Sequence, residues 1–131
     1  MSDGPVPIVE LERVSRSYQV GDQTLQALRE ASAVIPAGDY VAVMGPSGSG
    51  KSTMLNTLGC LDRPTSGVYR LDGREVGSLS DDELSEVRRH LIGFVFQSFH
   101  LIARLTAEEN VALPMVLDSL PPEERAERVA T

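Results

Sequence analysis

Lysine, cysteine and tryptophan are almost missing from this chain of 131 residues, which has a single cysteine and no tryptophan. One cysteine, Cys60, excludes an internal disulfide and fits a reducing compartment, and we expect its side chain to be packed. Lysine and arginine together number 12 against 19 acidic residues, giving a formal net charge of −7. Because the basic residues form no cluster, the composition argues against nucleic acid as the main partner.

Long apolar runs are also missing, which excludes a membrane-spanning helix of about 20 apolar residues. Pro114, Gln97 and charged residues interrupt the longest apolar stretches. Residues 1–5 show no basic start followed by an apolar stretch, so we expect no signal peptide. With 41% apolar residues, the chain has the length of one domain with a modest core.

Lys51, the only lysine, lies in a segment that matches the pattern G-x-x-x-x-G-K-[ST] in full. This pattern is the Walker A phosphate-binding loop. An apolar run, residues 40–44, precedes it and predicts a buried parallel strand, and residues 52–61 predict a helix. Strand, glycine-rich loop and helix follow one another in the order that such a loop requires. The segment, called the phosphate loop below, consists of Gly45, Pro46, Ser47, Gly48, Ser49, Gly50, Lys51, Ser52 and Thr53.

Each residue type in the phosphate loop has its own chemistry. Its glycines permit unusual backbone angles and let main-chain N–H groups approach a phosphate, while the following helix directs its positive end at the same anion. We expect Lys51 to reach the β- and γ-phosphates, Ser52 to bind Mg²⁺ and Thr53 to add a donor towards the α-phosphate. The alternative is a strand-to-helix turn without a ligand.

The remaining pattern indicates an alternation of strands and helices. Capping boxes at Ser80/Glu83 and Thr106/Glu109 predict two helix starts. The first of these helices carries a basic pair, residues 88–89, that is typical of a solvated face. The predicted strands are residues 8–18, 25–35 (after a turn at 21–22), 68–71 and 92–96, and the predicted helices are residues 81–90, 107–117 and 123–129.

Beyond the phosphate loop, residues 58–67, 92–99 and 105–111 resemble ABC transporter ATPase subunits, in particular the macrolide-export and lipoprotein-release (MacB/LolD-like) branch. The resemblance covers the chain from about residue 8 onwards. It implies an α/β P-loop NTPase fold, the ABC-type nucleotide-binding domain, with an N-terminal antiparallel β subdomain and a parallel core. The chain would be a partial domain: a flexible N-terminus (1–7), the β subdomain and Walker A core (8–97), and the start of the helical subdomain (98–131).

The resemblance also implies roles for residues outside the phosphate loop. Tyr18 matches the aromatic residue that stacks on adenine, whereas without the resemblance an ordinary strand tyrosine would be the preferred interpretation. Gln97 matches the glutamine that contacts Mg²⁺ and the attacking water, so the catalytic pair would be Lys51 and Gln97, and the metal ligands Ser52 and Gln97. The region after Gln97 would bind a membrane permease through Phe99, Leu101, Ile102 and Leu105.

Three motifs of such ATPases do not occur in these 131 residues: the signature loop, the Walker B strand and the switch histidine. The nearest apolar-acidic run, residues 115–118, lies in a predicted helix. We therefore expect the N-terminal half of a nucleotide-binding domain, a fragment or a truncated product, with unpaired sheet edges.

Such a half-domain would bind ATP and Mg²⁺ without hydrolysing ATP unaided. The full-length form would be an export or membrane-extraction ATPase at the cytoplasmic face of the membrane, with a permease and a second ATPase subunit as partners. The alternatives are a non-hydrolysing nucleotide-binding or permease-interacting module and a small P-loop kinase.

Overall fold

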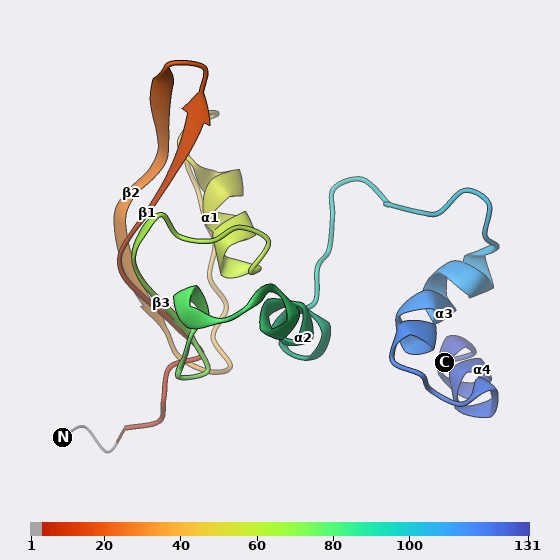
Figure 1. Cartoon of the computed structure of the whole chain (residues 1–131). Helices are drawn as coiled ribbons and strands as arrows, with labels where there is room; N and C mark the ends of the chain where they lie inside the picture. The colour runs from red at the N-terminus through yellow and green to blue at the C-terminus, as the bar shows by residue number, and fades with distance from the viewer. Residues whose placement is uncertain (1–3) are drawn as a thin grey trace. The chain divides into compact units, whose positions relative to one another are not determined.

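The computed structural model describes residues 4–131 and divides into two compact units, one ending at Phe94 and the other comprising Val95–Thr131 (Figure 1). The division falls slightly before the boundary predicted after Gln97. The flexible N-terminus was predicted for residues 1–7, of which residues 1–3 lie outside the described part of the chain.

In the first unit, an antiparallel sheet has the strand order β2-β1-β3-β4. β1 (Val9–Val20) and β2 (Gln23–Ile35) form a long hairpin, visible as the red and orange ribbons in Figure 1. β3 (Ser66–Leu71) pairs with the other edge of β1, and β4 (Arg74–Glu75) follows it. The turn predicted between the first two strands forms at Gly21, where φ is +59°.

Helices of the first unit pack with this sheet around a small core. They are α1 (Lys51–Leu58) and α2 (Asp81–Leu91), with the short 3₁₀ turn η1 (Val76–Ser78) between β4 and α2. Apolar side chains from β1, β2 and β3 meet those of α2 and the end of the α1 region because each element presents one apolar face. The buried cluster consists of Leu11, Val14, Leu28, Cys60, Tyr69, Leu71, Val76, Leu84 and Val87.

Two segments predicted as buried parallel strands, residues 40–44 and 92–96, are not part of the sheet. Tyr40 is 96% exposed and Val95 is fully exposed. A strand forms only where a neighbour supplies the ladder of hydrogen bonds, and within residues 4–131 no strand lies beside either segment. As strands, these two predictions are wrong for this chain, whereas unpaired edges were expected of it.

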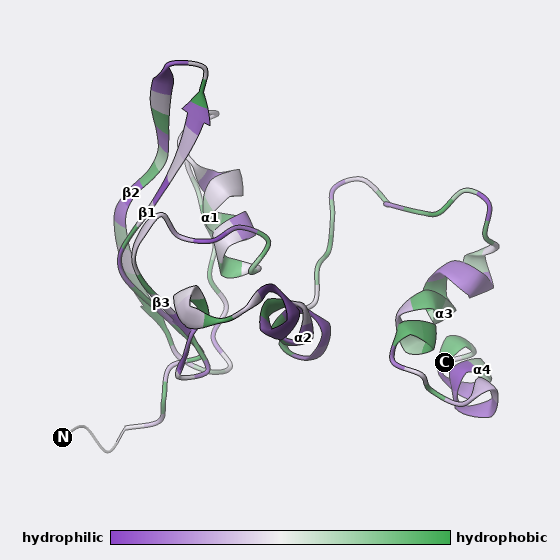
Figure 2. Ribbon diagram, in the orientation of Figure 1, coloured by the Kyte–Doolittle hydropathy of each residue, from purple (hydrophilic) through white to green (hydrophobic). Residues whose placement is uncertain are grey.

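The second unit contains α3 (Ala107–Leu117) and α4 (Pro122–Val129). Both predicted capping boxes form, at the starts of α2 and α3. Figure 2 shows that α3 is largely hydrophobic, whereas α2 and α4 are rich in hydrophilic residues, yet α3 has no buried residue. Among the helices that the structure describes, none has the length and apolar character needed to cross a membrane.

Candidate functional site

The phosphate loop ends at the N-terminus of α1, where main-chain donors are available. Gly50 is the N-cap residue, and it provides no side-chain hydrogen bond to the helix. The first N–H groups of a helix have no intrahelical acceptor, and they carry the positive end of its dipole. Since the first turn of α1 also contains no acidic residue, this end of the helix suits an anion.

Lys51 lies folded over the same loop. Its Nζ donates to the carbonyl oxygens of Gly45 at 2.6 Å and Pro46 at 2.8 Å, and the Ser49 N–H donates to the Pro46 oxygen at 3.2 Å. The ammonium therefore lies at the loop backbone, next to the donors at the start of α1. Its predicted contact with the β- and γ-phosphates stays a prediction.

The glycines of the loop serve two different purposes. Gly48 and Gly50 have φ of +80° and +95°, in the left-handed region that glycine adopts without strain. Gly45 is not among the glycines with positive φ, so the prediction of unusual angles fails there. A Cβ on Gly45 would instead lie 2.6 Å from the Ser49 Oγ, and one on Gly50 would lie 2.6 Å from the Ala27 carbonyl oxygen.

A cavity of about 380 Å³ opens beside the loop. The sequence predicted the loop side of this cavity, but not its other wall, which comes from β2. The residue pattern of β2 does not distinguish these wall residues, because they line the cavity only as a result of the folded strand lying close to the loop. The lining residues are Leu25, Gln26, Ala27, Ser47, Gly48, Gly50, Lys51, Ser52 and Thr53.

Tyr18 lies on β1 directly opposite Leu25, one of the cavity residues. Directly paired residues on antiparallel strands have their side chains on the same face, but Tyr18 itself is not among the residues that line the cavity. Its hydroxyl donates to Asp62 Oδ2 at 2.5 Å. Asp62, just beyond the end of α1, lies in the segment 58–67 that carries the family resemblance, but the sequence predicted no role for it.

α1 ends earlier in the chain than predicted. The helix stops at Leu58 rather than residue 61, because Cys60 adopts φ of +54° and Leu61 N–H donates to the Asn56 oxygen at 2.9 Å. This is the Schellman pattern, with cysteine where glycine is usual. Cys60 is 2% exposed, as predicted, and burial raises the pKa of its thiol, which keeps it protonated and inert.

Two further side chains bind carbonyl groups at this end of α1. The Tyr69 hydroxyl donates to the Leu58 oxygen at 2.7 Å, and Arg88 donates to the Cys60 oxygen at 2.8 Å. Burial raises the pKa of Tyr69 strongly, so the hydroxyl stays a donor. The prediction that Arg88 lies on a solvated face is wrong, because the residue is partly buried and its guanidinium binds the Cys60 carbonyl group. These bonds fix the direction of α1 and hence the position of the phosphate loop.

Gln97 belongs to the second unit and is exposed. Beside it in sequence, the rings of Phe96 and His100 stack with centroids 4.2 Å apart. Ser52, the other predicted Mg²⁺ ligand, is exposed on the first unit. Their joint action on one metal ion therefore stays a prediction.

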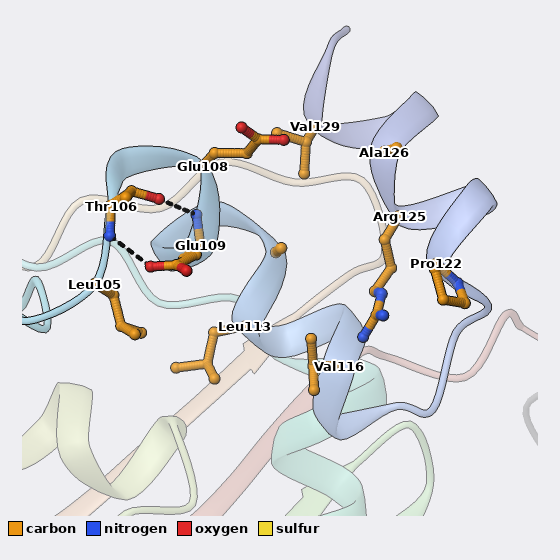
Figure 3. Close-up of a pocket in the computed structure, with 11 residues that line it drawn as sticks. Leu105, Thr106, Glu108, Glu109, Leu113, Val116, Pro122, Arg125, Ala126 and Val129 are labelled. Atoms are coloured by element: carbon orange, nitrogen blue, oxygen red, sulfur yellow. Dashed lines mark hydrogen bonds between the residues drawn. The ribbon is translucent and has the colours of Figure 1, made fainter.

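A groove of about 670 Å³ lies between α3 and α4 in the second unit (Figure 3). Leu113 and Val116 line it from α3, and Ala126 and Val129 from α4. Among the residues predicted to contact a permease, only Leu105 lines this groove. Phe99, Leu101 and Ile102 are not among its lining residues, and Phe99 is 89% exposed.

The model of the ABC transporter family matches residues 28–131, which include the phosphate loop and both helices of the second unit. The chain belongs to this family. It is 51% identical over 121 residues to the uncharacterized ABC transporter ATP-binding protein YknY of Bacillus subtilis, covering 92% of this chain and 53% of that protein. It is 50% identical over 124 residues to the macrolide export ATP-binding/permease protein MacB of Bordetella avium, covering 95% and 19% respectively.

Solved structures of the ATP-binding cassette MJ0796 have the same fold. The dimeric post-hydrolysis structure with ADP and Pi gives a TM-score of 0.86 at 47% identity, covering 93% of this chain and 54% of that one. The family member described here therefore has the fold of a truncated P-loop ABC cassette over 93% of the chain, and it spans about half the length of YknY and of the MJ0796 cassette.

Proposed function

We propose that this chain is the ATP-binding part of an ABC transporter ATPase that powers export or membrane extraction through a partner permease. The observation that carries the proposal is the uncapped N-terminus of α1, where Lys51 lies over the loop beside a cavity. The name of the MacB relative, a macrolide export protein, supports the export branch. The transported substrate would be chosen by the permease.

The residues at the cavity fit a magnesium–triphosphate. In the proposed complex, Lys51 exchanges its two carbonyl acceptors for β- and γ-phosphate oxygens, and main-chain N–H groups at the start of α1 donate to the same phosphates. The exposed Ser52 hydroxyl would hold Mg²⁺, which neutralises developing charge when bound. Thr53, which also lines the cavity, would donate to the α-phosphate.

Gln97 and Tyr18 complete the proposed nucleotide site. Tyr18, which pairs with the cavity residue Leu25, would stack on adenine, and Gln97 would contact Mg²⁺ and the attacking water. The second unit, which begins just before Gln97, would bind the permease on the cytoplasmic face of the membrane. A second ATPase subunit would complete the full-length assembly.

A second candidate function is a nucleotide-binding module without hydrolysis. It is favoured by the missing signature and Walker B motifs within these 131 residues. Walker B provides the carboxylates that bind Mg²⁺ and orient water, so without them the transition state loses most of its positioning. We therefore expect nucleotide binding without phosphate release from this chain alone.

The test is binding of a fluorescent ATP analogue with Mg²⁺, with phosphate release measured in the same samples. We expect Lys51→Ala to weaken binding by at least about tenfold, because it removes a charge-assisted contact to phosphate. Arg128→Ala, which removes one positive charge from the exposed surface of α4, is the matched control and should bind normally. Equal binding by the Lys51→Ala variant would contradict the proposal, and phosphate release would contradict the non-hydrolysing alternative.

A further inference from the structure

Arg16, Tyr18 and Asp62 form a connected cluster between β1 and the chain that follows α1. Arg16 Nη2 lies 2.6 Å from Asp62 Oδ1, and the other oxygen of that carboxylate accepts from the Tyr18 hydroxyl at 2.5 Å. The guanidinium carbon lies 4.6 Å from the centroid of the Tyr18 ring. One carboxylate thus holds the end of the ring, while a cation covers one of its faces.

The cluster is partly shielded from water, and a further hydrogen bond holds the Arg16 side chain in place. The side chains of Arg16 and Asp62 are 23% and 22% exposed, and Arg16 Nη1 donates to the Arg63 carbonyl oxygen at 3.0 Å. Partial burial weakens solvent screening of the ion pair. Among residues 4–131, Arg16 Nε has no hydrogen-bond partner although it is buried, which costs free energy.

The cluster is linked to the phosphate loop through α1, because the helix begins at Lys51 and Asp62 lies just beyond its end. It is also linked through the hairpin, because Tyr18 pairs with Leu25 at the wall of the cavity. The ring is half-exposed. Its hydroxyl and one face are occupied, so a flat partner would have to use the opposite face.

We propose that Asp62 and Arg16 are positioning residues that hold the Tyr18 ring for the adenine base. This inference rests on the proposed function. A tethered hydroxyl and a covered face restrict the side chain before the ligand arrives, so less conformational entropy is lost when a base stacks on it. A cation on the far face also favours an electron-rich purine on the near face.

The competing explanation is purely structural: the cluster joins β1 to the end of α1 and does nothing else. In that case, losing it would weaken every ligand of the phosphate loop equally, because the whole loop would shift. Inorganic tripolyphosphate has the phosphates of ATP but no base, so it separates the two explanations.

The experiment compares Mg–ATP and Mg–tripolyphosphate binding to the 131-residue chain by calorimetry. We expect Asp62→Asn to weaken ATP about three- to tenfold, the value of one hydrogen bond or stacking contact, and to leave tripolyphosphate unchanged. Tyr18→Phe, which removes only the hydroxyl, should act in the same way. In a Tyr18→Ala background, Asp62→Asn should cause no further loss, because the ring it positions is gone.

Asp81→Asn is the matched control, because it removes a carboxylate from an exposed ion pair with Arg63 and should affect neither ligand. The positioning role is overturned if Asp62→Asn weakens both ligands alike, leaves ATP unchanged, or keeps its effect without Tyr18. It is also overturned if the wild-type chain binds ATP no more tightly than tripolyphosphate. If Asp62→Asn does not fold, Tyr18→Phe decides the question alone.

The proposed function fails separately. Lys51→Ala should weaken both ligands, since both use the phosphate site. If tripolyphosphate binding is absent, or survives Lys51→Ala, the phosphate site itself is refuted, and the positioning role is refuted with it. If Lys51→Ala weakens both ligands while Asp62→Asn does not discriminate between them, only the positioning role is lost.

Discussion

At the scale of single residues, neighbouring backbone atoms decide which glycines of the phosphate loop can be replaced. Gly48 has open space around the position of a Cβ, whereas a Cβ on Gly50 would lie 2.6 Å from the Ala27 carbonyl oxygen. Both residues have positive φ. Both glycines therefore need a left-handed backbone conformation, but only Gly50 lies too close to β2 for a side chain to fit.

Replacing these two glycines by alanine should separate conformation from contact. Gly48→Ala should lower the free energy of unfolding by about 1 kcal/mol, the cost of a left-handed non-glycine residue. Gly50→Ala should cost about 2–3 kcal/mol, because strain and overpacking act together. Urea unfolding monitored by circular dichroism measures both. Equal losses would mean that the approach of β2 to the loop adds nothing.

At the scale of elements, α2 has a charged cap at its start. Glu83 accepts from the Ser80 backbone N–H at 2.8 Å, and the Ser80 hydroxyl accepts from the Glu83 N–H at 3.2 Å. The backbone hydrogen bond from Ser80 is the main reason why the pKa of Glu83 is lowered from 4.5. The carboxylate form is thus favoured by the folded helix.

This cap predicts a specific loss of stability in acid. The pKa of Glu83 is lower in the folded state than in the unfolded state. The stabilisation from this cap is therefore fully present above about pH 4.5, and it is lost as the pH falls through the lowered folded-state pKa. Thermal unfolding midpoints between pH 7 and pH 3 should fall less for Glu83→Gln than for the wild type. Asp82→Asn, which removes a charge from the same turn, is the control and should keep the wild-type slope. Parallel slopes for Glu83→Gln would refute the assignment.

The elements that the sequence predicted are those with local causes. The hairpin turn, both capping boxes and the helix after the phosphate loop arise from residues close together in the chain, and all form. Features that depend on distant partners escaped prediction. Examples are the Ala27 contact with Gly50, the Asp62 bond to Tyr18 and the reach of Arg88 to Cys60, which join positions far apart in sequence.

Paired apolar strands failed as a prediction for the same physical reason. An apolar run such as residues 40–44 has the composition of a buried strand, but composition alone supplies no hydrogen-bonding neighbour.

Positive φ at Arg13 and Glu30 within the hairpin was equally unpredictable. There the Ser32 hydroxyl accepts from the Arg13 N–H, and the Ser15 hydroxyl accepts from the Glu30 N–H, so side chains replace ladder bonds between the strands.

At the scale of the whole molecule, the second of the two units begins with a segment without regular structure. Residues 95–101 contain no helix or strand, and Phe99 and Leu101 are 89% and 67% exposed. Exposed segments outside the sheets and helices are preferred sites of proteolytic cleavage. The segment also contains Gln97, so the residue proposed to contact Mg²⁺ and the attacking water lies close to the boundary between the units in sequence.

Brief treatment with chymotrypsin under native conditions should therefore cleave within residues 96–101, as it should at Tyr40 in the equally exposed segment 40–44, before it cuts the β1–β2 hairpin. Mass spectrometry should find the fragments from these cuts before any cut in the hairpin. Phe99→Ser with Leu101→Ser should slow the cleavage within residues 96–101, while the single change Tyr40→Ser, at another exposed aromatic residue, should leave it unchanged. A first cut inside the hairpin would contradict the division into two units.

Lys51 donates to the carbonyl oxygens of Gly45 and Pro46. These carbonyl groups therefore compete with any bound anion for the lysine ammonium. An incoming anion must replace both of these acceptors, and its affinity measures a difference between two sets of oxygens. A monovalent or singly contacting anion gains little from that exchange, whereas a triphosphate, with several charged oxygens, gains from every donor at once. Internal competition of this kind would reject weak anions without any steric gate.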